Sequence, residues 1–555
     1  MVCVAASRRD EGAAGAAHRP GSDPEGRTRP HRFVKSPARS VLTTETRLGA
    51  GPVLRTGSRA AYRAVEELEG EPHVVRTELV DSPGGDLETE GPTIACIAHI
   101  TDLHVTDAQS PARFEWVNRY SQDPRFRELI TMQRPQETLN AHAIAATVRT
   151  VNRVEAAPVT GAAVALAVMT GDAIDNTQRN ELTNFLALFE GGLVRPDSGL
   201  PGYDGVQRAD WPGEIYWKPD GPPHGDMFQS ALGFPRRPGL IEQAMEPFRS
   251  EGLRIAWLGC YGNHEEACQG VGVVTPALAA AMTGSRKAIE PPPGLDPDQA
   301  IDTFIDHPER FADGASVEVQ PDPERRPVSR AEFVDAHVRS GAHGFTDGNT
   351  GEGTAYYAHD EGIVRFITLD TVCDAGGADG SIDATQLHWL ERRLEEVHSS
   401  FQTRDGSTVR TRNADRYVVV LSHHGYDTMS NPRGEKRADA LLALLLRFGN
   451  VVLWLNGHIH ANRITPRVDP AGGRGFWEVT TGSLVDWPCQ ARLVELFGTR
   501  AGHLAIACTM LDHDGEGLAG LHRELAGNAQ YVGFDGVRSG TPLDRNTILL
   551  APRPF

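Results

Sequence analysis

The sequence predicts an α/β sandwich in which strands and helices alternate from residue 94 onward. Short apolar runs of β-prone residues recur along the chain, and segments with a helical period separate them. Polar motifs rich in Asp, Asn and His directly follow several of the apolar runs. Because ligands bind outside the carboxyl ends of strands in α/β sheets, we expect these motifs to share one edge of the fold.

The expected elements follow one another in a regular order. Apolar runs predict strands at 94–100, 163–169, 253–258, 364–369, 417–421, 451–455, 476–480, 491–496 and 504–510. The segment 137–154 has a helical period with no Pro or Gly inside, so it predicts a helix, as does 180–189. The segment 384–397 predicts an amphipathic helix, because Leu387, Leu390 and Leu394 fall on one face.

The ends of the chain differ in composition from its middle. Residues 1–40 are rich in Arg, Gly and Pro and are expected to be disordered. Residues 41–90 are expected to form a loose lead-in segment with one short helix near 60–68. The main domain is expected over 91–515, with a C-terminal extension at 516–555.

Two long intervals interrupt the regular plan, at about 195–249 and 270–354. Both are rich in Pro, Gly, Trp and charged residues, so they are expected to be insertions into the domain. They are interpreted either as lids or specificity loops over the site or as segments that pack on its flank.

Composition narrows the classes of function. The chain has 555 residues and a formal net charge of -19, which argues against long nucleic acid as the main ligand but not against a small phosphorylated substrate. Seven cysteines do not indicate a disulfide framework. The sequence holds no apolar run long enough for a membrane span and no export signal as written, so we expect a cytoplasmic protein. Export remains an alternative if the true start differs, because Arg8-Arg9 resembles part of a twin-arginine signal.

Five short motifs carry residue types that bind metals. They are Asp102-Leu103-His104, Gly171-Asp172, Gly262-Asn263-His264-Glu265, His423-His424 and Gly457-His458-Ile459-His460. Alternate residues of an extended chain point the same way, so the outer two residues of an Asp-x-His or His-x-His motif can face one ion. Carboxylate, amide and imidazole ligands together suit two divalent cations such as Mn, Fe or Zn better than Ca or Mg.

The order of these motifs resembles that of the calcineurin-like metallophosphoesterase superfamily over residues 94–465. The chain is similar to a long-insert bacterial branch of its predicted members. The resemblance implies a four-layer αββα sandwich of two mixed β-sheets with helices outside, carrying the long insertions. It also implies two metal ions and a role for each site residue: Asp102, His104 and His460 bind the first metal, Asp172 bridges, Asn263, His423 and His458 bind the second, and His264 sits near the leaving group.

Two positions depart from related patterns. Asp175 stands where purple acid phosphatases place a tyrosine, so a purple chromophore is not expected. His423 and His424 are adjacent, and the proline of the family's His-x-Pro pattern is absent, since Gly425-Tyr426 follows. We assign the ligand to His423 and leave two interpretations of His424 open, substrate contact or packing. The segment 486–488 is interpreted either as pocket lining or as the end of a strand.

The resemblance implies a phosphoesterase that hydrolyses a small phosphomonoester or phosphodiester by in-line attack of a metal-bridging hydroxide. His264 is expected to protonate the leaving group, and Glu265 to orient His264. The alternatives are a non-catalytic scaffold that keeps the fold for partner binding, and a nuclease. Scaffolds usually lose ligands or the leaving-group histidine, whereas this chain keeps them all, and a nuclease would need a basic groove.

Overall fold

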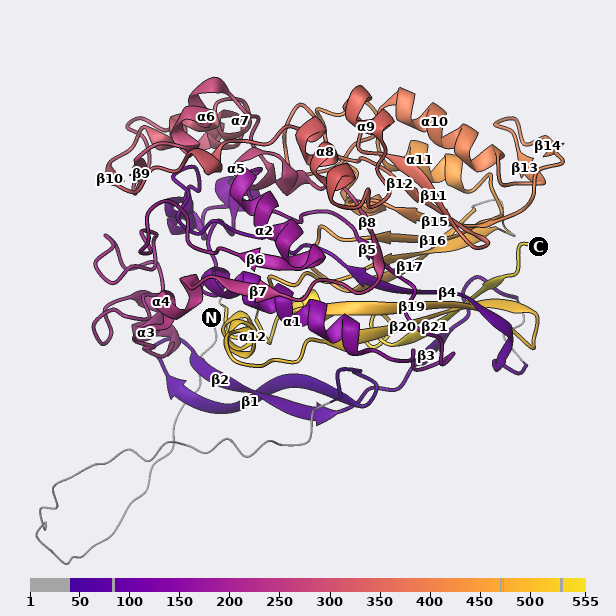
Figure 1. Cartoon of the computed structure of the whole chain (residues 1–555), viewed down its shortest axis with the longest axis horizontal. Coiled ribbons are helices and arrows are strands. Elements are labelled where there is room, and N and C mark those ends of the chain that lie inside the picture. Colours follow the sequence, from indigo (N-terminus) through magenta and orange to yellow (C-terminus); the bar gives the residue numbers. More distant parts are fainter. Residues whose placement is uncertain (1–39, 82–84, 470–471, 473, 530–532) are drawn as a thin grey trace, which may run out of the picture. The chain divides into compact units, whose positions relative to one another are not determined.

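Two mixed β-sheets form the centre of the fold in the computed structural model, which describes residues 40–81, 85–469, 472, 474–529 and 533–555 (Figure 1). Ser40–Phe555 forms one compact unit. The disorder expected for residues 1–40 concerns residues that, apart from Ser40, lie outside the described ones.

The first sheet has seven strands. Their order is β3 (Val74–Arg76), β21 (Thr547–Pro552), β20 (His503–Asp512), β19 (Gln490–Thr499), β4 (Thr89–Ile100), β5 (Leu166–Met169) and β8 (Ala256–Gly259). β4, β5 and β8 are parallel, whereas β19 is antiparallel to both β4 and β20. The lead-in segment and the C-terminal extension each supply a strand to this sheet, β3 and β21, which pair in parallel.

The second sheet has six strands. Their order is β11 (Tyr357–Glu361), β12 (Val364–Thr368), β15 (Tyr417–Leu421), β16 (Val451–Asn456), β18 (Gly475–Thr480) and β17 (Arg463–Val468). The four inner strands are parallel and the two edge strands are antiparallel to their neighbours. Every residue of β15 is buried, as expected for a parallel strand covered on both faces.

Packing on both faces of the sheets produces four layers. Val419 and Leu421 belong to the large apolar cluster that also contains strands of the first sheet, whereas Val418 and Val420 pack with Leu390 under the helices. The helices of this outer layer are α10 (Ala384–Glu395) and α11 (Ala438–Leu445). The layer on the first sheet contains α1 (Asn140–Arg153), α2 (Arg179–Glu190) and α12 (Leu518–Gly527). The predicted four-layer αββα sandwich is confirmed.

The remaining elements are short and belong mostly to the insertions. The helices are α3 (Met227–Leu232), α4 (Leu240–Met245), α5 (Ala267–Gly270), α6 (Pro276–Met282), α7 (Ala300–Asp306), α8 (Arg330–Ser340) and α9 (Asp347–Glu352). Short strands form the pairs β6 (Gly192–Val194) with β7 (Phe248–Ser250), β9 (Arg286–Ala288) with β10 (Ser316–Glu318), and β13 (Ser400–Gln402) with β14 (Thr408–Arg410). Among the described residues, no helix has the length and apolar character that a membrane crossing requires.

The prediction of a short helix near 60–68 is wrong. The segment forms β2 (Ala61–Glu69), which pairs antiparallel with β1 (Thr46–Thr56). Tyr62 is buried on this strand, and its hydroxyl donates a hydrogen bond of 2.7 Å to Glu524 of α12. Pairing with β1 and packing against a distant helix therefore override the helical preference of the local residues.

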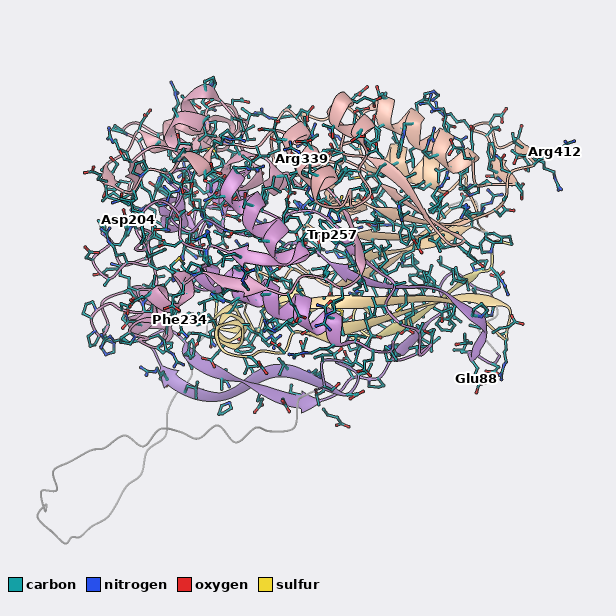
Figure 2. The ribbon with its side chains drawn as sticks, in the orientation of Figure 1. Glu88, Asp204, Phe234, Trp257, Arg339 and Arg412 are labelled. Carbon is teal, nitrogen blue, oxygen red and sulfur yellow. The ribbon has the colours of Figure 1, made fainter. Side chains whose placement is uncertain are left out.

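The insertion 195–249 lies at the end of the sheets where the first motif follows β4 (Figure 1). Figure 2 places Asp204 and Phe234 of the insertion 195–249 at the opposite end of the fold from Glu88, which precedes β4. The two insertions also meet at Asp107, three residues after His104. The Asp107 carboxylate accepts hydrogen bonds from Arg325 Nε (2.8 Å) and Ser198 Oγ (2.8 Å). Both insertions are therefore anchored to the loop that carries the first motif.

We expect Asp107→Ala to lower the free energy of unfolding by about 3–5 kcal/mol, because it strands the buried Arg325 guanidinium without its partner. Burial acts to raise the pKa of Asp107. The charge of Arg325 and the hydrogen bonds from Arg325, Ser198 and the Gln109 backbone outweigh it, so the pKa is lowered. The stabilisation is therefore present at neutral pH and should shrink as the pH falls below about 4. Urea unfolding at pH 7 and pH 3.5 measures both effects. Asp298→Ala, which breaks an exposed pair with Arg125, is the control and should cost at most about 1 kcal/mol; equal losses in the two variants would contradict the prediction.

Candidate metal centre

Five strand ends deliver the motifs to one place. Asp102 and His104 follow β4, Asp172 follows β5, and Asn263 and His264 follow β8. The second sheet contributes three more side chains, which follow its adjacent strands β15 and β16: His423, His458 and His460. The structure therefore brings all seven side chains expected to bind metal, and His264 beside them, to the carboxyl edges of the two sheets.

The backbone at these positions is unusual. Five of the seven residues have left-handed φ angles: Asp102 (51°), His104 (48°), Asp172 (55°), His458 (69°) and His460 (52°). Residues other than glycine rarely adopt this conformation, and it persists where the surrounding structure holds it in place, as it does at functional sites. Two glycines of the motifs also allow close approach, because a Cβ at Gly262 would clash with Asp172 and one at Gly457 with Asp102.

The first group of side chains contains Asp102, His104, His460 and Asp172, whose ligand atoms all lie within 4.8 Å of one another. The Nε2 atoms of His104 and His460 are 3.0 Å apart, and His460 Nε2 lies 3.4 Å from Asp102 Oδ1. Two nitrogens that each bind one cation at about 2.1 Å, at right angles, are separated by about 3 Å. The spacing therefore suits a shared ion.

The second group contains Asn263, His423 and His458. Asn263 Oδ1 lies 2.9 Å from His423 Nε2 and 3.1 Å from His458 Nδ1, and these two nitrogens are 3.2 Å apart. Asp172 Oδ2 lies between the two groups, 3.1 Å from His423 Nε2 and 3.7 Å from His104 Nε2. This is the position that a bridging carboxylate needs.

Hydrogen bonds at the far ring nitrogens orient three of the imidazoles. His104 Nδ1 lies 3.2 Å from Asp175 Oδ1, His460 Nδ1 2.7 Å from Asp486 Oδ2, and His423 Nδ1 2.9 Å from the Thr170 carbonyl. A carboxylate or carbonyl oxygen only accepts, so in each neutral ring Nδ1 carries the proton and Nε2 presents its lone pair to the site. The Nε2 lone pairs of His104 and His460 thus face each other, which an intervening cation would stabilise.

The pKa of His423 is raised, although the residue is fully buried. Burial acts to lower its pKa, but Asp172 outweighs burial and, with Asp102, raises the pKa to about 9 among the protein's own charges. A proton and a metal ion are alternative ways to neutralise the same acceptors, so metal affinity at this site should depend on pH.

His264 lies at the rim of the two groups, with its side chain 16% exposed. Its Nδ1 is 3.0 Å from the Asp175 carbonyl, and its Nε2 is 3.9 Å from Asp172 Oδ2. Burial acts to lower the pKa of His264, but Asp172 and Asp175 outweigh it, and the pKa is raised. The residue expected beside the leaving group is therefore next to the metal groups and accessible from outside.

The expected role of Glu265 is wrong. Its carboxylate accepts backbone hydrogen bonds from Gly262 (2.6 Å), Asp172 (3.0 Å), Ala173 (2.7 Å) and Ile174 (3.2 Å). Glu265 therefore holds the Asp172 loop against the Gly262 loop and fixes the backbone around Asp172. Asp175, rather than Glu265, holds the His264 ring.

His424 forms a further group with His423 and His458. Both of its ring nitrogens are already engaged, Nε2 with the Ala378 carbonyl at 2.8 Å and Nδ1 with Thr371 Oγ1 at 2.9 Å. Burial and the neighbouring His423 lower the pKa of His424 to about 3, so the ring is neutral. Its ring packs 4.4 Å from that of His458, measured between centroids, which favours the packing interpretation.

Two buried carboxylates support the site: Asp175, for which the sequence predicts no role there, and Asp486, which belongs to the segment interpreted from the sequence either as pocket lining or as the end of a strand. Asp175 binds His104 and His264 and is itself paired with Arg113 at 2.8 Å. Asp486, which holds His460, is paired with Arg134 at 2.8 Å and also with Arg538. The only sequence signals were the place of Asp175 three residues after Asp172 and the place of Asp486 after a strand, and neither specifies a partner.

Comparisons with known proteins add little to this geometry. Neither a protein-family model nor a curated protein sequence matches the chain. Among solved structures, the chain is similar to the sulfate thiohydrolase SoxB of Thermus thermophilus in complex with glycerol, at 14% identity and a TM-score of 0.26. The similarity covers 79% of this chain and 60% of that one, so the chain spans about 60% of the length of its structural relative.

The fold and the site together define a class: an α/β sandwich protein with a buried cluster of His and Asp side chains suited to binding metal ions. A similarity as remote as the one to SoxB says nothing about activity. The reaction has to be inferred from the arrangement of the side chains.

Proposed function

We propose that this chain is a binuclear metal-dependent hydrolase of small phosphate esters. The observation that carries the proposal is the position of Asp172 Oδ2 between two groups of side chains, each with two imidazoles and a further oxygen ligand. Asp102, His104 and His460 would hold one ion, and Asn263, His423 and His458 the other. When bound, two such cations supply an acidified water as nucleophile and neutralise phosphate oxygens.

The donor set fits this role. Mixed nitrogen and oxygen ligands favour Mn, Fe or Zn, and the neutral oxygen of Asn263 keeps the total charge of the ligands low. In the neutral ring, the hydrogen bonds at Nδ1 of His104, His423 and His460 leave the lone pair on Nε2, directed to the site.

Protonation of the leaving group would then fall to residues of the chain itself. His264 Nδ1 donates to the Asp175 carbonyl, which leaves Nε2 facing the site. When Nε2 is protonated, it can pass this proton to the oxygen of the departing alcohol, which is the step that limits hydrolysis of esters with poor leaving groups. Asp175 and Arg113 keep the ring in this orientation.

Metal content and a substrate panel test the proposal. We expect about two Mn, Fe or Zn ions per chain, hydrolysis of p-nitrophenyl phosphate or bis(p-nitrophenyl) phosphate, loss of activity with EDTA, and recovery with Mn. The ratio of the two activities separates a monoesterase from a diesterase. A purified chain that binds no metal and hydrolyses no phosphate ester with Mn, Zn, Fe or Mg would overturn the proposal in favour of a scaffold.

A further inference from the structure

Three successive residues with a left-handed backbone closely follow the third motif, residues 262–265. Cys268, Gln269 and Gly270 have φ angles of 54°, 55° and 79°, and the first two have ψ angles of 49° and 43°. Residues other than glycine rarely adopt this conformation, so two in succession carry backbone strain that the surrounding structure has to hold. Strain of this kind is concentrated at functional sites, and the role of the turn 268–270 follows from what it contacts.

The carbonyl of Gly270 faces one end of the Asn263 amide. It accepts a long hydrogen bond of 3.4 Å from Asn263 Nδ2. Since a carbonyl oxygen only accepts, the NH₂ end of the amide faces Gly270, and Oδ1 lies on the side of His423 and His458, 2.9 Å and 3.1 Å from their ring nitrogens. An amide turned over would present N–H groups to a cation in the second group and could not bind it.

Glycine at position 270 allows the turn to approach Asn263 this closely. A Cβ added there would lie 2.2 Å from Asn263 Nδ2 and 2.7 Å from the backbone carbonyl carbon of Asn263. The backbone of Gly270 therefore packs directly on the amide, and a larger residue would have to displace it.

Gln269 anchors the turn to the loop that carries Asp172. Its backbone N–H donates to Asn176 Oδ1 at 3.1 Å, and its side-chain Nε2 donates to Asp175 Oδ2 at 3.3 Å. Gln269 is buried, so these hydrogen bonds form in a low-dielectric interior, where they are stronger than in water. The turn is therefore fixed to the same loop that delivers Asp172 to the site.

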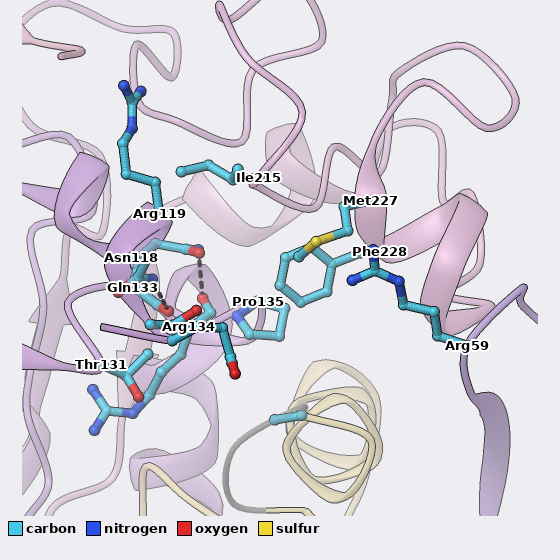
Figure 3. Close-up of a pocket in the computed structure, with 13 residues that line it drawn as sticks. Arg59, Asn118, Arg119, Thr131, Gln133, Arg134, Pro135, Ile215, Met227 and Phe228 are labelled. Atoms are coloured by element: carbon cyan, nitrogen blue, oxygen red, sulfur yellow. Dashed lines mark hydrogen bonds between the residues drawn. The ribbon is translucent and has the colours of Figure 1, made fainter. Parts of the chain in front are cut away.

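A second anchor of Gln269 lies beside a cavity of about 170 Å³ (Figure 3). Gln269 Nε2 also donates to the Met132 carbonyl at 3.2 Å, and the sequence neighbours of Met132, Thr131 and Gln133, line this cavity. Asn118 holds the segment, because its Nδ2 donates to the Gln133 carbonyl at 3.0 Å (Figure 3) and its Oδ1 accepts from the Met132 backbone N–H at 2.9 Å. This anchor of the turn is thus itself held by hydrogen bonds.

We propose that the turn 268–270 is a positioning element of the second group: it holds the Gly270 carbonyl against Asn263 Nδ2, so that Oδ1 is the atom presented to a cation. The inference rests on the proposed function, because it takes Asn263 as a metal ligand. A carboxylate presents an oxygen whichever way it turns, whereas only one end of an amide can bind a cation. The neutral oxygen ligand is therefore the one that needs a fixed orientation, and Gly270 and Gln269 are positioning residues that act through it.

Zinc titration of the metal-free full chain, in competition with a chromophoric chelator, tests the inference without turnover. We expect Gly270→Ala to weaken zinc binding at the second group at least about 10-fold and to leave the first group unchanged, because the added Cβ displaces the Asn263 amide. Anomalous diffraction at the zinc edge shows which group keeps its ion.

Gly239→Ala is the matched control. Gly239 has a φ of 80°, and a Cβ added there would meet nothing within 4 Å. The substitution therefore brings the same backbone strain without the contact to an amide, and zinc affinity should stay as in the wild type at both groups.

Gln269→Ala keeps the inference testable if Gly270→Ala does not fold. It removes two hydrogen bonds of the turn without adding an atom near Asn263, and Arg113 still holds Asp175 at 2.8 Å. We expect the second group to lose more zinc affinity than the first. Wild-type affinity at the second group in either folded variant, or a greater loss at the first group, would overturn the inference.

The same titration separates this inference from the proposed function. A wild-type chain that binds zinc at both groups but hydrolyses no phosphate ester would contradict the proposed function alone, and the variants would still decide the role of the turn. A wild-type chain that binds no zinc would overturn both.

Discussion

Asp172→Asn should reduce kcat/KM for a phosphate ester by at least about 10³-fold and leave the chain with fewer bound metal ions. Asp172 Oδ2 is close to a histidine of each group, 3.1 Å from His423 Nε2 and 3.7 Å from His104 Nε2. The amide has the same shape but lacks the charge needed to hold two cations together. Metal analysis of the purified variant, beside steady-state kinetics with added Mn, measures both losses.

The metal-free Asp172→Asn variant should also be less stable than the metal-free wild type. Burial acts to raise the pKa of Asp172, but the charges of His423 and His264 outweigh it and hold the pKa well below its ordinary value, so the amide would leave the buried His423 imidazolium without its partner. Thermal unfolding in EDTA at pH 7 is therefore expected to show a lower Tm for the variant than for the wild type. A variant that keeps its metals and its activity would show that Asp172 does not bridge, and a variant that fails to fold would show that its role is structural.

The position of the candidate site was predictable because it depends on local sequence. Apolar runs such as 417–421 fix the strands, and a residue that directly follows a buried parallel strand has to emerge at the carboxyl edge of the sheet. His423 and Asp172 could thus be placed near each other although 251 positions separate them in the sequence. The pattern also predicted the helix at 384–397, because its leucines share one face.

The parts that could not be predicted depend on contacts between distant segments. The local residues of β2 predict a helix. The segment is a strand because it pairs with β1 and because Tyr62 packs against α12. The support of His460 by Asp486, and of Asp486 by Arg134, joins residues 26 and 352 positions apart. The left-handed φ angle of His458 could not be predicted either, since this conformation is uncommon even for histidine and tertiary contacts impose it.

His264→Ala should keep both metal ions and lose activity only where the leaving group needs a proton. His264 lies beside the metal groups, with Nε2 3.9 Å from Asp172 Oδ2, but the Asn263 oxygen and the other imidazoles remain in place without it. General acid catalysis contributes about 10²–10⁴-fold, so kcat for an alkyl phosphate should fall by that factor. The kcat for p-nitrophenyl phosphate should change much less, because p-nitrophenolate leaves without a proton.

The comparison of the two leaving groups decides what His264 does. His388→Ala, which removes an exposed histidine of α10, is the matched control and should leave both rates unchanged. If kcat falls equally for the alkyl and p-nitrophenyl esters with both metals retained, His264 positions the substrate rather than donating a proton. If the metals are lost, His264 supports the metal groups, and the proton must come from another group or from water. Only a selective loss on the alkyl ester, at full metal content, agrees with the ring geometry that the Asp175 carbonyl imposes.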